Sequence, residues 1–326
     1  MQPAALQELT AASGREFPQL ARARRSTSEG LADRRARLGA LSHQPDVAVV
    51  LMGSWGRFEL TSGSDDDFMI LVRGPEREQV APSIEQVGTV LDKAPGDQGI
   101  FGKPVYSDQI IQKIGLERDN NSNLSQRMLL LLESVYATGA AVHGSVREQL
   151  IDRYLDQSVK DFRPPRFLLN DVIRYWRTIC VDFAGKEREG PEKWGIRNAK
   201  LRTSRKVLFA GGLLPVFECA RLEARQMAPF LRSQLDMAPT DRIAQAFLNH
   251  QAPDPGGRAL GAYDDFLGLL DEEDFRAELE SVTRESSKSS AAFSEAARLG
   301  SELERGLSAL LFETSLYPLV REYGIF

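Results

Sequence analysis

The chain has 326 residues, a formal net charge of −5 and a hydrophobic content of 42%, which suits a soluble globular protein. Its length exceeds that of one typical domain, so we expect two domains with cores of their own. The negative charge argues against a general nucleic-acid binder, whose surface would be basic. No apolar run reaches the roughly 20 residues that a membrane span requires, so no membrane partner is expected. Cys180 and Cys219 have no metal-ligand spacing and favour buried thiols in a cytoplasmic protein.

Residues 1–44 predict an N-terminal helical segment. It contains an arginine-rich stretch from Arg15 to Arg37, in which Leu20 and Leu31 are available for packing. Acidic residues such as Glu16 and Glu29 argue against a transit peptide. A charge run on a helix is usually a solvated face. We therefore expect exposed arginines, with contact to nucleic acid or an acidic partner as the alternative.

Two strand-like runs enclose the most informative part of the sequence. The first, from Asp46 to Met52, is β-branched and apolar and ends at Gly53 and Ser54. A helix that begins there would direct its free N–H groups at an anion, for which triphosphate oxygens are suited. The second run extends from Asp67 to Val72.

Carboxylates precede the second run. If the strand extends back to Ser64, Asp65 and Asp67 share one face, because strand side chains alternate. Asp66 then points to the other face, where we expect it to be solvated. Two carboxylates about 7 Å apart can share a pair of Mg²⁺ ions roughly 4 Å apart. Mg²⁺ prefers oxygen ligands and keeps substrate phosphates in its shell, so we predict a nucleoside triphosphate with Mg²⁺, or with Mn²⁺ in its place.

The segment from Gly53 to Asp67 resembles the signature of the polymerase-β-type nucleotidyltransferase superfamily. The matching residues are Gly53-Ser54-x-x-Arg57 followed by Ser64-Asp65-x-Asp67. With Glu59, the spacing is similar to the branch that contains PII uridylyltransferases and glutamine synthetase adenylyltransferases. Val142-His143-Gly144 resembles the close of the small domain in that superfamily. The resemblance covers about residues 45 to 145.

The resemblance implies a role for each matching residue. Gly53 and Ser54 would hold the triphosphate, with Arg57 and Ser64 in support. Asp65 and Asp67 would bind the metal ions.

The same superfamily also uses a third carboxylate on a later strand, which can bind metal and help to take the proton from the attacking hydroxyl. We choose Asp108, at the end of the strand-like run from Pro104, and keep Asp97 as the alternative. Asp108 could instead cap a helix from Gln109 to Ile114. If neither serves, the site is incomplete.

The remaining elements predict an α+β fold, in the form of a small mixed α/β sheet domain with flanking helices and an all-helical C-terminal domain. Residues 45–161 would form the nucleotidyltransferase domain, with helices at about 76–91 and 123–136. Pro164 and Pro165 mark the start of the helical domain, residues 162–326, because consecutive prolines block a helix. Its helices are expected at about 166–186, 195–211, 213–235, 240–250, 263–282 and 291–320, with loops at 252–257 and 286–290.

Basic residues crowd one part of the helical domain. Arg197, Lys200 and Ser204 share a helical face through their spacing. We expect Arg197 and Lys200 to contact phosphates across a cleft from the Gly53–Asp67 segment. The alternative is a solvated surface on which they pair with nearby carboxylates. By contrast, His43, His143 and His250 have no ligand or triad spacing, so nucleophilic catalysis by the protein is not expected.

Together these features predict a Mg²⁺-dependent nucleotidyltransferase. It would move an NMP unit from an NTP to an acceptor hydroxyl and release pyrophosphate. The acceptor could be a protein, a small molecule or RNA. The alternatives are a catalytically inactive nucleotide-sensing or scaffolding protein, and an immunity or toxin nucleotidyltransferase that makes a signalling nucleotide or modifies tRNA.

Overall fold

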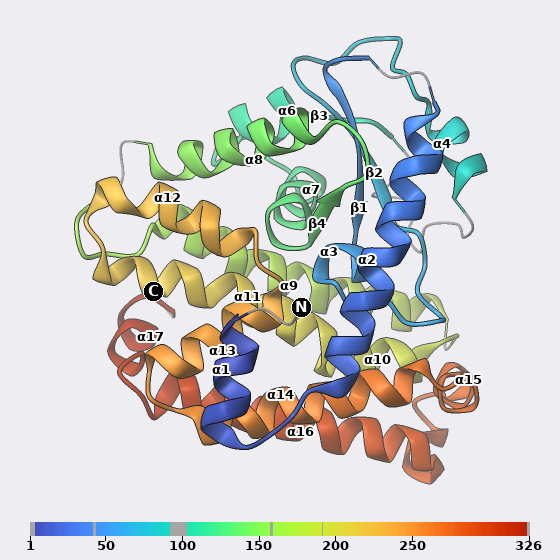
Figure 1. Ribbon diagram of the computed structural model, residues 1–326, viewed down its shortest axis with the longest axis vertical. Coiled ribbons are helices and arrows are strands. Elements are labelled where there is room, and N and C mark those ends of the chain that lie inside the picture. Colours follow the sequence, from blue (N-terminus) through green and yellow to red (C-terminus); the bar gives the residue numbers. More distant parts are fainter. Residues whose placement is uncertain (1–3, 42–43, 92–102, 157–158, 191, 325–326) are drawn as a thin grey trace.

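The computed structural model describes residues 4–41, 44–91, 103–156, 159–190 and 192–324. Most of these residues are helical, and they surround one small mixed sheet, as the predicted fold class requires (Figure 1). None of the described helices is long and apolar enough to cross a membrane.

Within the part of the chain that the structure describes, the sheet has four strands in the order β3-β2-β1-β4. The central strands β1 (Val47–Met52) and β2 (Phe68–Val72) run antiparallel to each other. β3 (Val105–Tyr106) is parallel to β2, and β4 (Ser134–Tyr136) is antiparallel to β1. Every residue of β1 and β2 is buried, which explains why both read as continuous apolar runs and were predicted.

β4 was not predicted. A helix was expected at 123–136, but α7 spans Asn121–Leu132 and the chain then extends, so that Ser134 pairs with Met52 of β1. Gly56 allows the close approach that this pairing needs, because a Cβ atom there would lie 2.0 Å from the carbonyl oxygen of Glu133. The helix formed by the leucine run therefore ends at Leu132, and the chain pairs with β1 from Ser134 onwards.

Short helices flank the sheet. α3 (Ser54–Arg57) follows β1, α4 (Ile84–Val90) follows β2, α6 (Ser107–Gln112) follows β3, and α8 (Ala140–Leu155) follows β4. α4 is shorter than the helix predicted at 76–91. It starts only after Ser83, whose side chain accepts a hydrogen bond from the Gln86 N–H group at 3.2 Å in a capping box.

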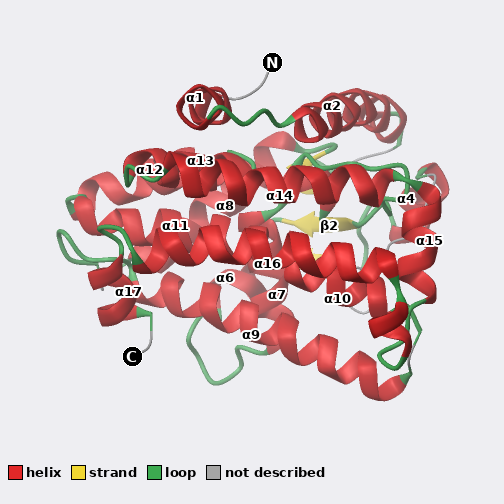
Figure 2. Cartoon of the chain, turned by 90° about the horizontal axis from the view of Figure 1, so that it is seen from below, coloured by secondary structure: helices red, strands yellow, loops and turns green. Residues whose placement is uncertain are grey.

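The N-terminal segment forms α1 (Ala4–Ser13) and α2 (Pro18–Gly39), so the prediction of helices is confirmed. Both pack as an outer layer on the C-terminal helices α13 and α14 (Figure 2). Arg22 and Arg25 of α2 are exposed, whereas its other arginines are half-buried or buried. Arg24 is buried, and its guanidinium lies 2.6 Å from the carboxylate of Asp241 on α13. The prediction of solvated arginines therefore holds for only part of α2, and Arg24 ties this helix to the helical layer.

The C-terminal half is helical, as predicted, although several boundaries differ. Its α-helices are α9 (Arg166–Glu189), α10 (Trp194–Arg202), α11 (Ser204–Glu218), α12 (Ala224–Leu235), α13 (Pro239–Asn249), α14 (Pro253–Asp271), α15 (Glu273–Ser281), α16 (Ala291–Phe312) and α17 (Tyr317–Tyr323). Two 3₁₀ turns lie at Cys219–Arg221 and Ser286–Ser289. The loop predicted at 252–257 is instead the first turn of α14, because a proline is tolerated at the start of a helix.

One hydrophobic core crosses the predicted boundary at residue 161. It includes Val50 and Met69 of the sheet, Leu130 of α7, and Leu214 and Phe266 of the C-terminal helices. The other face of the sheet packs in a second cluster with α2 and α4. The two predicted domains therefore share a core, and the sheet is held between helices from both ends of the chain.

His143 on α8 gives the fold a pH dependence. Its ring is buried, its Nε2 atom lies 2.8 Å from the Ser134 Oγ atom, and burial lowers its pKa from 6.5 to about 3. Below pH 6.5 the unfolded chain thus binds a proton that the folded chain does not. The stability is fully present above pH 6.5 and is lost as the pH falls, by about 2 kcal/mol between pH 7 and pH 5.

Urea unfolding at these two pH values measures the effect. The His143→Gln protein can still hydrogen-bond Ser134 but cannot titrate, so its free energy of unfolding should depend less on pH by the same amount. Equal pH dependences for the two proteins would contradict the assignment to His143.

Candidate functional site

A cleft of about 570 Å³ lies between the Gly53–Asp67 segment and the C-terminal helices. The ends of β1 and β2 form one side, while α7, α9, α10, α11 and the junction of α14 and α15 form the others. All predicted site residues except Asp108 line this cleft: Gly53, Ser54, Arg57, Ser64, Asp65, Asp67, Arg197 and Lys200.

The turn after β1 requires glycine. Gly53 has φ +64° and ψ −127°, a conformation that side chains disfavour, and a Cβ atom there would lie 3.1 Å from the Asp67 carboxylate. The Met52 N–H group donates to the Asp67 carbonyl oxygen at 2.9 Å and so fixes Asp67 beside the turn. Ser54 then opens the single-turn helix α3, as the sequence indicated. The turn and the second carboxylate are therefore neighbours.

The three consecutive aspartates have different surroundings. Asp65 is exposed and Asp67 half-buried, and both line the cleft. Asp66 points away from the cleft, as expected, but the prediction that it is solvated is wrong. It is buried and accepts a hydrogen bond from the Trp55 indole N–H group at 3.0 Å, with the Arg34 guanidinium of α2 at 3.4 Å. No local pattern in the sequence indicated that α2 would cover this face.

Asp108 is not part of the cleft, which corrects its assignment as the third carboxylate. β2 and β3 are parallel, with Val72 opposite Tyr106, and the Asp108 N–H group donates to the Gly74 carbonyl oxygen at 3.4 Å. Asp108 therefore lies level with the far end of β2, roughly 20 Å along the strand from Asp67. It lies in the first turn of α6, whose N-cap is Tyr106, so the alternative that Asp108 caps a helix is also wrong. Asp97 lies outside the described residues.

Arg197 and Lys200 bring positive charge to the opposite wall. Both lie on α10 and are half-buried, and neither side chain forms an ion pair with any residue that the structure describes. Burial, with the nearby guanidinium groups of Arg276 and Arg205, lowers the pKa of Lys200 to about 8, while the Asp65 carboxylate opposes this shift. The alternative, in which neighbouring carboxylates neutralise Arg197 and Lys200, therefore does not apply to these two side chains.

The floor of the cleft is a buried charged network. The Arg57 guanidinium donates to Glu59 at 2.8 Å and to Glu133, while the Tyr263 hydroxyl donates to Glu59 at 2.7 Å. Burial raises the pKa of Glu59. Burial also acts to lower the pKa of Arg57, but the charges of Glu133 and Glu59 oppose it, and the pKa of Arg57 is raised overall. Arg57 was predicted to support the triphosphate, but its charge is already shared between two carboxylates, so it holds the floor together.

Glu133 lines the cleft and Tyr263 hydrogen-bonds the cleft residue Glu59, and neither was expected from the sequence. Glu133 is fully buried and also lies 3.5 Å from the Arg205 guanidinium. A sequence signal existed for it, because a glutamate directly follows the apolar run from Met128 to Leu132. No local signal marked Tyr263, which reaches the floor from α14.

The C-terminal helices α14 and α15 contact the loop that carries Asp65 and Asp67. The Ser62 N–H group donates to the Asp271 carboxylate of α14 at 2.7 Å. The Arg276 guanidinium of α15 lies directly against Gly63, where a Cβ atom would be 2.3 Å from its Nη1 atom. The position of Asp65 and Asp67 therefore depends on α14 and α15 as well as on the sheet.

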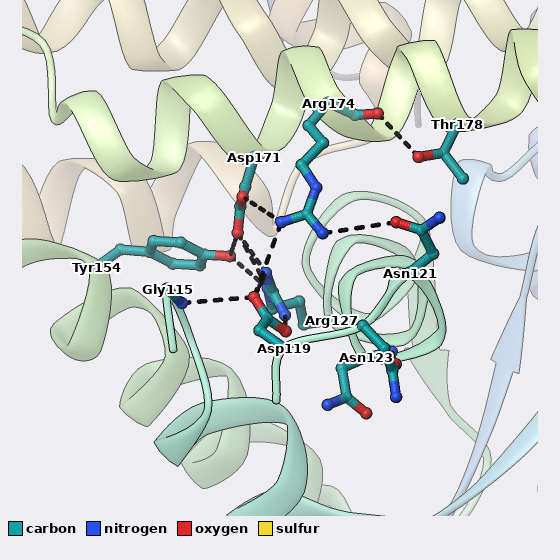
Figure 3. A network of polar contacts seen from close by, with 10 residues as sticks. Gly115, Asp119, Asn121, Asn123, Arg127, Tyr154, Asp171, Arg174 and Thr178 are labelled. Atoms are coloured by element: carbon teal, nitrogen blue, oxygen red, sulfur yellow. Dashed lines mark hydrogen bonds and ion pairs between the residues drawn. The ribbon is translucent and has the colours of Figure 1, made fainter. Parts of the chain in front are cut away.

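A second buried network fixes the wall made by α7 and α9 (Figure 3). The Arg127 guanidinium donates to both oxygens of Asp119 at 2.7 Å and to Asp171 at 2.5 Å. The Tyr154 hydroxyl of α8 donates to Asp171 at 2.7 Å. This network holds three helices in register beneath the cleft wall, and Arg174 links it to the cleft residue Asn121 at 3.5 Å.

The carboxylates of the cleft suit a metal ion that arrives with its own ligands. Within the described residues, no group of three or more His, Cys, Asp or Glu side chains is arranged to hold a metal ion. Mg²⁺ is commonly bound by only one or two carboxylates together with substrate phosphates, and Asp65 and Asp67 fit that requirement.

Comparisons with known proteins add no further assignment. The chain matches no protein-family model, no curated protein and no solved structure.

Proposed function

We propose that this protein is a nucleotidyltransferase that transfers an NMP unit from an NTP to an acceptor hydroxyl and releases pyrophosphate. One observation carries the proposal: two carboxylates, Asp65 and Asp67, share a cleft with two cations, Arg197 and Lys200, that have no ion-pair partner among the described residues. The two pairs come from segments far apart in the sequence. Opposite charges on facing walls suit a ligand that is itself a polyanion carrying metal ions.

The residues of the cleft have distinct tasks in this proposal. Arg197 and Lys200 bind the triphosphate oxygens and offset their charge. The Gly53 turn lets the phosphates approach the backbone, since no side chain stands in the way. Asp65 and Asp67 hold Mg²⁺, which when bound would draw charge from the α-phosphate and the departing pyrophosphate.

Label transfer tests the proposal directly. The purified protein is incubated with Mg²⁺ and each of the four α-labelled NTPs, with and without cell extract, and the label is then sought in protein, RNA and small-molecule fractions. We expect Mg²⁺-dependent transfer from at least one NTP, and the labelled fraction identifies the class of acceptor. Failure of all four NTPs to label any fraction would contradict catalysis.

The place of Asp108 favours a second candidate function. Without Asp108 as a third metal-binding carboxylate beside Asp65 and Asp67, the cleft could bind a nucleotide without turning it over, as in a sensing or scaffolding protein. Calorimetric titration with each NTP and Mg²⁺, run beside the transfer assay, separates the candidates. Binding without transfer would establish the sensor, and transfer would exclude it.

Lys200→Ala should weaken nucleotide binding by about 10- to 100-fold, because a hydrogen bond to a charged group contributes about 1.5–3 kcal/mol. Calorimetry gives the dissociation constant and the transfer assay gives KM. Lys193→Ala is the matched control, since Lys193 is mostly exposed, lies 3.8 Å from Glu280 and does not line the cleft. An unchanged affinity in Lys200→Ala would remove Lys200 from the phosphate site.

A further inference from the structure

Three side chains form a chain of hydrogen bonds outside the cleft. Glu218 ends α11, His250 follows α13, and Ser315 lies in the loop between α16 and α17. The Ser315 Oγ atom is 2.7 Å from His250 Nδ1, and His250 Nε2 is 2.5 Å from the Glu218 carboxylate. α17 lies at the opposite end of the helical half from α15, whose Arg276 lines the cleft (Figures 1 and 2).

The partners of the imidazole fix its tautomer. A carboxylate can only accept a hydrogen bond, so His250 Nε2 carries the hydrogen and donates it to Glu218. The Nδ1 atom of the neutral ring is then an acceptor, and the Ser315 hydroxyl donates to it. A hydroxyl whose proton lies on a hydrogen bond to an imidazole, which is in turn oriented by a carboxylate, is the arrangement of an activated serine nucleophile.

Exposure makes the serine reachable while its partners stay protected. Ser315 is exposed, whereas His250 and Glu218 are buried. The Arg221 guanidinium lies 3.4 Å from both the Ser315 Oγ atom and His250 Nδ1, where it can stabilise negative charge that develops beside the serine. This group of side chains therefore supplies a nucleophile (Ser315), a base (His250), a carboxylate that orients the base (Glu218) and a cation (Arg221).

Apolar side chains flank the serine. Phe312, the last residue of α16, is 55% exposed, and Tyr317, the first residue of α17, is 46% exposed. Both rings belong to residues within three positions of Ser315 in the sequence and are exposed, which favours a substrate with an apolar group. Because Ser315 is exposed, a small, unhindered substrate can reach its hydroxyl.

We propose that Ser315 is the nucleophile of a second site, which cleaves small carboxylic esters with an apolar acyl group. The Ser315 oxygen attacks the ester carbonyl carbon and its proton passes to His250 Nδ1. The carbon–alkoxy bond breaks, and the alcohol leaves with that proton. Water, deprotonated by the same nitrogen, then attacks the acyl carbon, the bond between the acyl group and the Ser315 oxygen breaks, and the proton returns from His250 Nδ1 to that oxygen. One ester and one water thus yield one acid and one alcohol. Nucleophilic catalysis was not expected from the sequence, because these three residues lie far apart in the chain.

Covalent labelling with a fluorophosphonate tests this site in the full-length protein. We expect one adduct, formed with loss of fluoride and mapped to Ser315 by peptide mass spectrometry. Ser315→Ala should abolish it. Ser301→Ala is the matched control and should not change it, because Ser301 is also exposed but its hydroxyl donates to the Ala297 carbonyl oxygen.

The dependence on His250 separates a catalytic serine from an accessible one. General-base help contributes about 10²–10⁴-fold, so His250→Gln should slow labelling by about 100-fold or more. The rate of p-nitrophenyl butyrate hydrolysis should be lost in Ser315→Ala and reduced in His250→Gln, as for labelling. Circular dichroism shows whether His250→Gln is folded. If it is not, Ser315→Ala decides the question. No adduct on Ser315, an equal rate in folded His250→Gln, or ester hydrolysis unchanged by Ser315→Ala would each overturn the proposal.

Discussion

Replacing Asp65 and Asp67 together by alanine is expected to lower nucleotidyl transfer by about 1,000-fold or more, since each charged group that acts at a reaction centre commonly contributes 10²–10³-fold. Both carboxylates line the cleft. Asp65 is exposed and Asp67 half-buried, so their loss leaves no large cavity and should cost little stability. The measurement is the initial rate of label transfer from an α-labelled NTP, with the unfolding midpoint as the check on folding.

Asp108→Ala is the matched control for this prediction. Asp108 was a catalytic candidate in the sequence but lies level with Gly74, at the far end of β2 from Asp67. Its replacement should leave the transfer rate within about twofold, because distant groups with no shared partner act independently. Transfer that survives in Asp65→Ala/Asp67→Ala would refute the metal-binding role, and a large loss in Asp108→Ala would mean that the third carboxylate acts there after all.

The parts of the site that sequence predicted are those with local signals. β1 and β2 are unbroken apolar runs, and Gly53 and Ser54 stop the first of them with a turn that only glycine adopts easily. Arg197 and Lys200 follow from their spacing on one helix. Each of these signals lies within a few residues of sequence, so it can be recognised without knowledge of the fold.

The parts that sequence could not predict depend on contacts between distant segments. Asp66 is buried because α2 covers it, and Asp108 is excluded by the parallel register of β2 and β3. Arg57 was predicted to support the triphosphate, but it pairs with Glu133, which directly follows α7, and with Glu59, to which Tyr263 of α14 donates. Charge pairing at long range decides whether a cation binds a ligand or the protein, and the amino-acid pattern around that cation does not contain this information.

Replacing Arg127 by methionine should reduce the free energy of unfolding by about 3–5 kcal/mol, the usual cost of removing one partner from a buried ion pair. The side chain of Arg127 is fully buried, and those of Asp119 and Asp171 are almost so. Methionine fills a similar volume but leaves two buried carboxylates without their main counter-charge. Urea unfolding of the two proteins under identical conditions measures the difference.

Two further variants show whether this cost comes from charge burial. Arg174→Met removes a guanidinium that is 38% exposed and 3.7 Å from Asp171, so it should cost at most about 1 kcal/mol. Tyr154→Phe removes one buried hydroxyl that bonds Asp171 and should cost about 1–3 kcal/mol. Since the network orders α7 and α9, folded Arg127→Met should also bind nucleotide less tightly than Arg174→Met. A loss below 1 kcal/mol in Arg127→Met would mean that the cleft wall is held by apolar packing alone.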